Sequence, residues 1–146
     1  MSGTLDIYRR LSRLPKGRWL FSRMVGRRAP YFKTIRPYVR TLEPFRAEVV
    51  VPKRRAVENH IRTVHVIAAV NGLEAAMGLL AEASVPKHLR WIPKGMEVAY
   101  VAKATSDLLC VATSEPAAWA QPGDVPVRVE AIRDDGTVVI GITDKS

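Results

Sequence analysis

The chain has 146 residues, enough for one domain with a single hydrophobic core. Its formal net charge of +9 is unevenly placed, because residues 1–60 hold fifteen Lys or Arg against four Asp or Glu. The single cysteine, Cys110, excludes an internal disulfide and fits a reducing compartment, and the arginines near the N-terminus are unlike a signal peptide. We therefore expect a soluble cytoplasmic protein.

The first part of the chain is predicted to be helical and basic. Residues 4–29 place apolar side chains at roughly helical spacing with arginines on the other face, and the pattern breaks near Pro15. Three prolines then mark a short connecting region: Pro30, Pro37 and Pro44. Residues 47–52 are rich in valine and are expected to form the first strand.

Residues 63–84 are predicted to form a long central helix, rich in leucine, alanine and methionine and free of proline. Thr63 is the expected N-cap. The segment is apolar nearly all round, so it should be buried. Its length would allow a membrane span, but Glu74 near its centre argues against one. A carboxylate inside a buried helix is costly unless it is paired, hydrated or functional, which makes Glu74 a candidate functional residue.

The rest of the chain has the alternating pattern of strands. The predicted strands are residues 96–104, 108–113, 125–131 and 137–143. Asp135 and Gly136 are a strong signal for a two-residue hairpin turn between the last two. We expect these four strands to form an antiparallel meander.

One strand, a long apolar helix and four further strands pack naturally as a sheet wrapped round the helix. This arrangement is an α+β hotdog fold. Small residues on the helix would allow the sheet to approach closely: Ala68, Ala69, Gly72, Ala75 and Ala76. The predicted organisation is a basic helical extension over residues 1–29 and a hotdog domain over residues 30–146.

The segment from Asn59 to His65, followed by Glu74, resembles the signature of hotdog-fold acyl-CoA thioesterases of the phenylacetate-pathway type. In that family an asparagine precedes a His-Gly-Gly at the start of the central helix, and an acid follows further along the same helix. Asn59, His65 and Glu74 match these three positions. The resemblance covers roughly residues 30–145 and is closest to a branch of unassigned function.

The resemblance implies thioester hydrolysis, with Glu74 as general base or nucleophile and backbone amides around Val66 as donors to the oxyanion. It also implies a homodimer, or a tetramer of two dimers, because the acid meets the helix start of the partner subunit in related enzymes. Val66 and Ile67 replace the two glycines after the histidine, and Arg62 stands where related loops often carry glycine. These departures favour one alternative, an acyl-CoA-binding protein without catalysis.

Basic residues flank the predicted site. Lys53, Arg54, Arg55 and Lys94 are candidates to bind the phosphates of coenzyme A or to attract an acidic acyl carrier protein, and a solvated basic face is the alternative. Coenzyme A would enter only as part of the substrate. The sequence has no CxxC, HExxH or glycine-rich phosphate loop, so neither a metal nor a nucleotide cofactor is expected.

Each candidate residue also has a structural interpretation. Glu74 could face solvent or pair with an arginine, His65 could bond the backbone at the helix start, and Asn59 could be a turn residue. Asn71 lies one turn before Glu74 and could hydrogen-bond to it. The basic helices of residues 4–29 could instead make this a peripheral protein that docks on an anionic membrane surface or on nucleic acid. No nucleic-acid-binding motif is recognised, so nucleic acid is not an expected partner.

Overall fold

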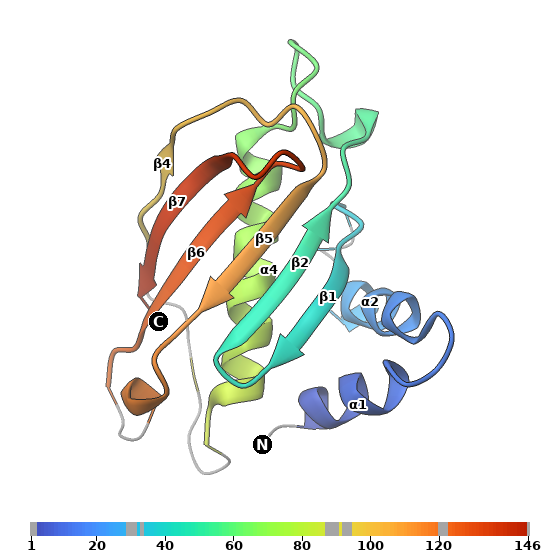
Figure 1. Cartoon of the computed structure of the whole chain (residues 1–146), viewed down its shortest axis with the longest axis vertical. Helices are drawn as coiled ribbons and strands as arrows, with labels where there is room; N and C mark the ends of the chain where they lie inside the picture. The colour runs from blue at the N-terminus through green and yellow to red at the C-terminus, as the bar shows by residue number, and fades with distance from the viewer. Residues whose placement is uncertain are drawn as a thin grey trace.

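The computed structural model describes residues 3–28, 32, 34–86, 91, 95–119 and 123–145. A seven-stranded antiparallel sheet lies against one long helix, with two further helices beside one edge of the sheet (Figure 1). The predicted α+β hotdog fold is confirmed. The elements, in chain order, are α1 (Gly3–Leu11), α2 (Gly17–Arg28), β1 (Tyr38–Glu43), β2 (Arg46–Val51), η1 (Arg55–Val57), α4 (Val66–Ser84), β3 (Gly95–Met96), β4 (Ala99–Tyr100), β5 (Leu108–Thr113), η2 (Pro116–Trp119), β6 (Pro126–Ile132) and β7 (Val138–Lys145).

The order of strands in the sheet is β1-β2-β5-β6-β7-β3, and β4 also pairs with β7. The single strand predicted over residues 96–104 is therefore two short strands, and the meander prediction was wrong for it. After β4 the chain crosses from the edge of the sheet back to β5 in the middle. The alternating pattern identified extended backbone here, but alternation carries no information about which strand is the partner.

Strand β1 was missed, because the prolines around it were interpreted as a connecting region. It pairs with β2 across a turn formed by Pro44 and Phe45. Phe45 has a φ of 71°, in the left-handed region that turn rules associate with glycine or asparagine. Its N–H donates a 2.8 Å hydrogen bond to Ser84 Oγ at the end of α4, which ties the turn to the helix.

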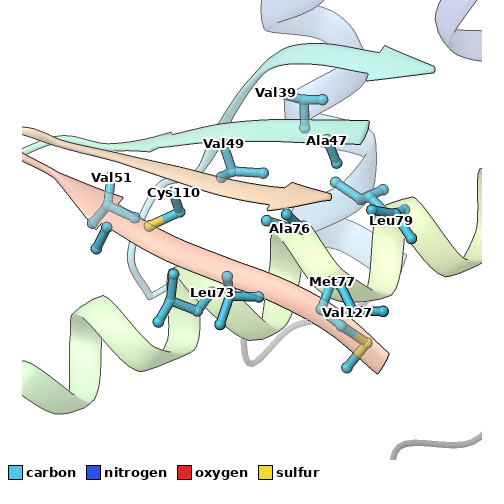
Figure 2. Close-up of a cluster of buried hydrophobic side chains, with 14 of the residues drawn as sticks. Val39, Ala47, Val49, Val51, Leu73, Ala76, Met77, Leu79, Cys110 and Val127 are labelled. Carbon is cyan, nitrogen blue, oxygen red and sulfur yellow. The ribbon is translucent and has the colours of Figure 1, made fainter. Parts of the chain in front are cut away.

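Helix α4 packs closely against the middle of the sheet at Gly72. A Cβ added there would lie 2.5 Å from Val51 Cγ2 and 2.7 Å from Cys110 Sγ, so only glycine fits without a shift. Val51 and Cys110 lie next to one another in the buried cluster between sheet and helix (Figure 2). By length and composition alone α4 could cross a membrane, but 61% of its apolar window is buried inside the protein. It is the core helix of the domain.

Helices α1 and α2 join the same hydrophobic core. Leu5 and Phe21 are almost completely buried in it. Two hydrogen bonds connect the helices to β1: Tyr8 Oη donates to the Arg40 carbonyl at 2.9 Å, and the Val39 N–H donates to Ser22 Oγ at 2.7 Å. The predicted division between an extension and a domain at residue 29 stays a prediction.

Candidate active site

The face of α4 that points away from the sheet carries the residue of most chemical interest, Glu74. Its carboxylate is partly buried and lines a cavity of about 300 Å³ together with Phe32, Ile67 and Asn71. Burial raises the pKa of the Glu74 carboxyl above its ordinary value. No charged group contributes to that shift, so the ion pair that the sequence left open is not found in the described part of the chain. Glu74 is therefore a partly buried carboxyl group that lines a cavity.

Asn71 is the polar residue whose importance the sequence did not indicate. Its side chain is 6% exposed, and its Oδ1 has no hydrogen-bond partner among the described residues. Its Nδ2 is 3.5 Å from Thr34 Oγ1, not bonded to Glu74 as one interpretation of the spacing predicted. Asn71 lines the Glu74 cavity and an adjacent, larger one of about 370 Å³. An unsatisfied buried acceptor at the junction of two cavities favours a ligand that donates a hydrogen bond.

Asn59 organises the loop that leads into α4. Its Oδ1 accepts hydrogen bonds from the N–H groups of Ile61 and Thr63, both at 3.1 Å, and its Nδ2 donates to Thr63 Oγ1 at 2.8 Å. Thr63 is therefore part of this loop and not the N-cap that was predicted. Arg62 adopts a φ of 62°, so the loop has the conformation that glycine favours although an arginine occupies the position. Asn59 and Val66 line a third cavity of about 190 Å³.

His65 is the N-cap of α4. Its Nδ1 accepts a 3.0 Å hydrogen bond from the Ile67 N–H, which agrees with the structural interpretation of this histidine. That bond also removes the Ile67 N–H from the expected set of oxyanion donors. The side chain is exposed at the edge of the larger cavity. In this arrangement His65 fixes the geometry of the helix start.

One chain does not bring the predicted catalytic groups together. Val66 and Glu74 are eight residues apart on α4, which is about 12 Å along the helix axis. A reacting carbonyl must lie within about 3 Å of both its attacking group and its oxyanion donors. Within the described chain the predicted catalytic residues therefore lie in two separate groups, Asn59 with Val66 and Glu74 by itself, which we call the two candidate half-sites.

The predicted phosphate-binding residues differ in their surroundings. Arg54 is partly buried, donates from Nη2 to the Thr34 carbonyl and keeps an unpartnered Nε. Burial and the neighbouring Arg36 lower the pKa of the Arg54 guanidinium. Arg55 is exposed in η1, and Lys94 lies outside the described residues. Arg54 and Arg36 together form a small region of positive charge beside the larger cavity.

Comparison with known proteins adds a family to this geometry. Residues 17–145 match the family described as Domain of unknown function (DUF4442). The chain belongs to this family. No curated protein matches it. The family match begins at the first residue of α2 and includes β1 and all of the candidate residues.

Several solved structures have a similar fold, and some of these proteins carry a functional description. The crystal structure of genomics APC5556 is 40% identical over 97% of this chain and 95% of that one, with a TM-score of 0.84. A Pseudomonas aeruginosa protein of unknown function, described as a probable thioesterase, is 18% identical over 90% of this chain and 93% of its own, with a TM-score of 0.77. A Staphylococcus aureus thioesterase is 14% identical over 80% of this chain and 95% of its own, with a TM-score of 0.66.

These similarities confirm the hotdog fold. The Staphylococcus aureus protein has been solved as two variants, one with a glutamine and one with a glutamate replaced by alanine. In that protein the replaced glutamate comes later in the sequence than the replaced glutamine.

Proposed function

We propose that this protein is a homodimeric thioesterase that hydrolyses acyl thioesters of coenzyme A or of an acyl carrier protein. The observation that carries the proposal is Glu74, a partly buried carboxylate with a raised pKa and no cationic partner among the described residues, facing a largely apolar cavity. A carboxyl group in such surroundings is suited to accept a proton near neutral pH. The apolar lining suits an acyl chain.

In the proposed reaction Glu74 removes a proton from a water molecule, whose oxygen attacks the thioester carbonyl carbon. The carbonyl oxygen becomes an oxyanion, which the α4 start around Val66 and the Asn59 loop stabilise. Collapse of the tetrahedral intermediate breaks the carbon–sulfur bond and releases the thiolate, to which protonated Glu74 returns its proton. Direct attack by Glu74 would give a mixed anhydride that water then hydrolyses, and the same residues serve both routes.

A second copy of the chain completes the site in this proposal. The two half-sites in one chain are too far apart, so Glu74 of one subunit would act with Asn59 and Val66 of the other. The sheet edge formed by β3 and β4 offers a surface for the partner, because Tyr100 and Val101 are more than half exposed there. Pairing of two such edges would bury them. A tetramer of two dimers is compatible with the same edge contact.

The spacing of the variants in the Staphylococcus aureus thioesterase supports the assignment. Glu74 follows Asn59 at the same separation in sequence as the replaced glutamate follows the replaced glutamine in that protein. Asparagine and glutamine carry the same amide group, so Asn59 can supply the same donor and acceptor atoms. The loop conformation at Arg62 shows how this chain keeps a glycine-like backbone there without glycine.

The basic group beside the larger cavity supports a phosphate-bearing substrate. Arg54 and Arg36 repel each other, and an anion between them would relieve that repulsion. Coenzyme A and the phosphopantetheine arm of a carrier protein both bear phosphate. Replacing Arg54 by alanine should weaken binding of both, more strongly at low salt than at high salt.

The test of catalysis is Glu74→Gln, which keeps the shape of the side chain and removes its basicity. Turnover of an acyl-CoA should fall by about 10²-fold or more, the usual scale for a general base, while binding of a non-hydrolysable analogue changes little. Undiminished turnover by a folded variant would exclude Glu74 as base or nucleophile. Absence of turnover in the wild-type protein, with retained analogue binding, would favour the second candidate function, acyl-CoA binding without hydrolysis. Val66 and Ile67 in place of two glycines are the observation that favours that candidate.

A further inference from the structure

Helix α2 has an outer face of unusual composition. The face comprises Trp19, Leu20, Arg23, Met24 and Arg27, and we call it the α2 outer face. Trp19 is 52% exposed and Leu20 45%, whereas Phe21 and Ser22 on the opposite side are buried against the rest of the protein. The preceding turn adds Leu14, also more than half exposed. Large apolar side chains are thus held in solvent on one side of a helix whose other side is anchored.

Positive charge surrounds these apolar residues. Residues 1–28 contain eight Lys or Arg and one acid, Asp6. On the α2 outer face the Arg23 guanidinium carbon lies 5.1 Å from the centre of the Trp19 ring, a cation–π contact. Arg27 follows Arg23 by one helical turn, so both lie between Trp19 and Leu20 around the helix. The face interleaves cations with an indole and aliphatic chains.

We propose that the α2 outer face docks on an anionic lipid bilayer. A bilayer interface takes indole rings and aliphatic side chains at the level of the headgroups, while arginines above them contact lipid phosphates. Each cation near an anionic surface adds to the attraction, and eight Lys or Arg lie within residues 1–28. The cation–π contact holds the Trp19 ring and the Arg23 guanidinium side by side, so that the ring can enter the interface while the guanidinium contacts a lipid phosphate.

Two other occupants fit the face less well. A second copy of the same face would bring two clusters of arginines together, which is electrostatically unfavourable. A nucleic acid would use the arginines through its phosphates but would leave Leu20 and Met24 exposed to water. Of these three occupants, the bilayer alone makes use of both the charge and the apolar side chains.

Vesicle co-sedimentation of the full-length protein tests the proposal. Vesicles of phosphatidylcholine with about a quarter phosphatidylglycerol should bind the protein, and vesicles of phosphatidylcholine alone should bind it much less. The double variant Trp19→Ser with Leu20→Ser should bind at least about 10-fold more weakly, because two apolar side chains no longer enter the interface. Trp19→Phe should bind within about twofold of the wild type. Absence of binding to anionic vesicles at low salt would refute the proposal.

Matched controls separate docking from general effects of charge and apolar exposure. Ile61 is 53% exposed in the loop before α4, so Ile61→Ser removes a comparable apolar group elsewhere and should leave vesicle binding unchanged. Arg23→Glu with Arg27→Glu should weaken binding at least about 10-fold, whereas Arg128→Glu on β6, also well exposed, should not. Equal losses from Ile61→Ser and from the double variant Trp19→Ser with Leu20→Ser would overturn the proposal. So would binding to duplex DNA that depends on Arg23 and Arg27 but not on Trp19 and Leu20, with no vesicle binding.

A second readout is independent of sedimentation. Vesicles containing brominated lipid should quench the fluorescence of Trp19, because its ring enters the interface. The quenching should disappear in Trp19→Phe although that variant still binds. Quenching that persists in Trp19→Phe would place another tryptophan at the membrane and contradict the proposed orientation. The result does not depend on Glu74, so the docking and the proposed hydrolysis can fail separately.

Discussion

Replacing Gly72 by alanine is a sharp test of how closely α4 approaches the sheet. In a solvent-exposed helix the change would stabilise the protein by about 1 kcal/mol, since glycine is a poor helix former. At Gly72 the new Cβ would lie 2.5 Å from Val51 Cγ2 and 2.7 Å from Cys110 Sγ. Carbon atoms in contact prefer about 3.5–4.0 Å, and relieving such overpacking costs about 1–3 kcal/mol. Subtracting the gain from this cost leaves an expected net loss of up to about 2 kcal/mol in the free energy of unfolding.

Gly78 provides the matched control on the same helix. Among the described residues a Cβ there would meet only Trp91 Cη2, at an ordinary 3.5 Å, so Gly78→Ala should raise the free energy of unfolding by up to about 1 kcal/mol. Chemical denaturation of both variants measures the two effects, which should have opposite signs. Truncating Val51 and Cys110 to alanine removes both clashing atoms, and Gly72→Ala should be harmless in that background. Stabilisation by Gly72→Ala in the otherwise wild-type protein would refute the packing described here.

Three further predictions concern ionisable groups. Cys110 is fully buried, which raises its pKa to about 12, so a thiol reagent should react with it only after unfolding; rapid reaction in native buffer would show that the core opens. Asp135 in the β6–β7 turn has a pKa of about 2, and the largest cause of this lowering is the hydrogen bond that it accepts from Arg133. The stabilisation it provides is present above its unfolded pKa and is lost as the pH falls toward 2, so Asp135→Asn should lower the melting temperature at pH 7 but not at pH 2. For Glu74 the folded pKa is raised, so wild-type stability falls as the pH rises from the unfolded pKa to the folded one. Glu74→Gln should therefore match the wild type below about pH 4 and exceed it in melting temperature near pH 7, and a variant less stable at pH 7 would indicate a structural partner for the carboxylate.

The sequence predicted the elements whose pattern is local. The apolar, proline-free run of α4 and a hairpin at Asp135 and Gly136 both appear, because helix propensity and hairpin chemistry act over a few residues. The predicted two-residue turn was wrong in its length, since β6 ends at Ile132 and β7 begins at Val138. The missed strand β1 depends on Phe45 in a left-handed conformation, which is stabilised by the hydrogen bond that its N–H donates to Ser84, 39 positions away. The position of β4 beside β7 depends equally on contacts that are distant in sequence.

The features of the candidate site likewise fall into those that the sequence predicted and those that it could not predict. Asn59 and His65 shape the loop and the helix start, as their structural interpretations predicted, since both act on neighbouring backbone groups. Two features could not be predicted: the unsatisfied Oδ1 of Asn71 and the proximity of two positive charges, Arg54 and Arg36. Both result from how the segment before β1 lies against α4 and η1. The distance between Val66 and Glu74 could be calculated from the sequence, because both residues lie on the same predicted helix.

The most direct test of a shared active site uses heterodimers purified through two different affinity tags. A dimer with Asn59→Ala in one subunit and Glu74→Gln in the other keeps one intact shared site, so it should retain about half of the wild-type turnover although each parent homodimer is inactive. A dimer with both changes in one subunit and none in the other loses both shared sites and should be inactive. The opposite pattern, an inactive first heterodimer and a half-active second one, would show that each chain carries a complete site and would contradict the account.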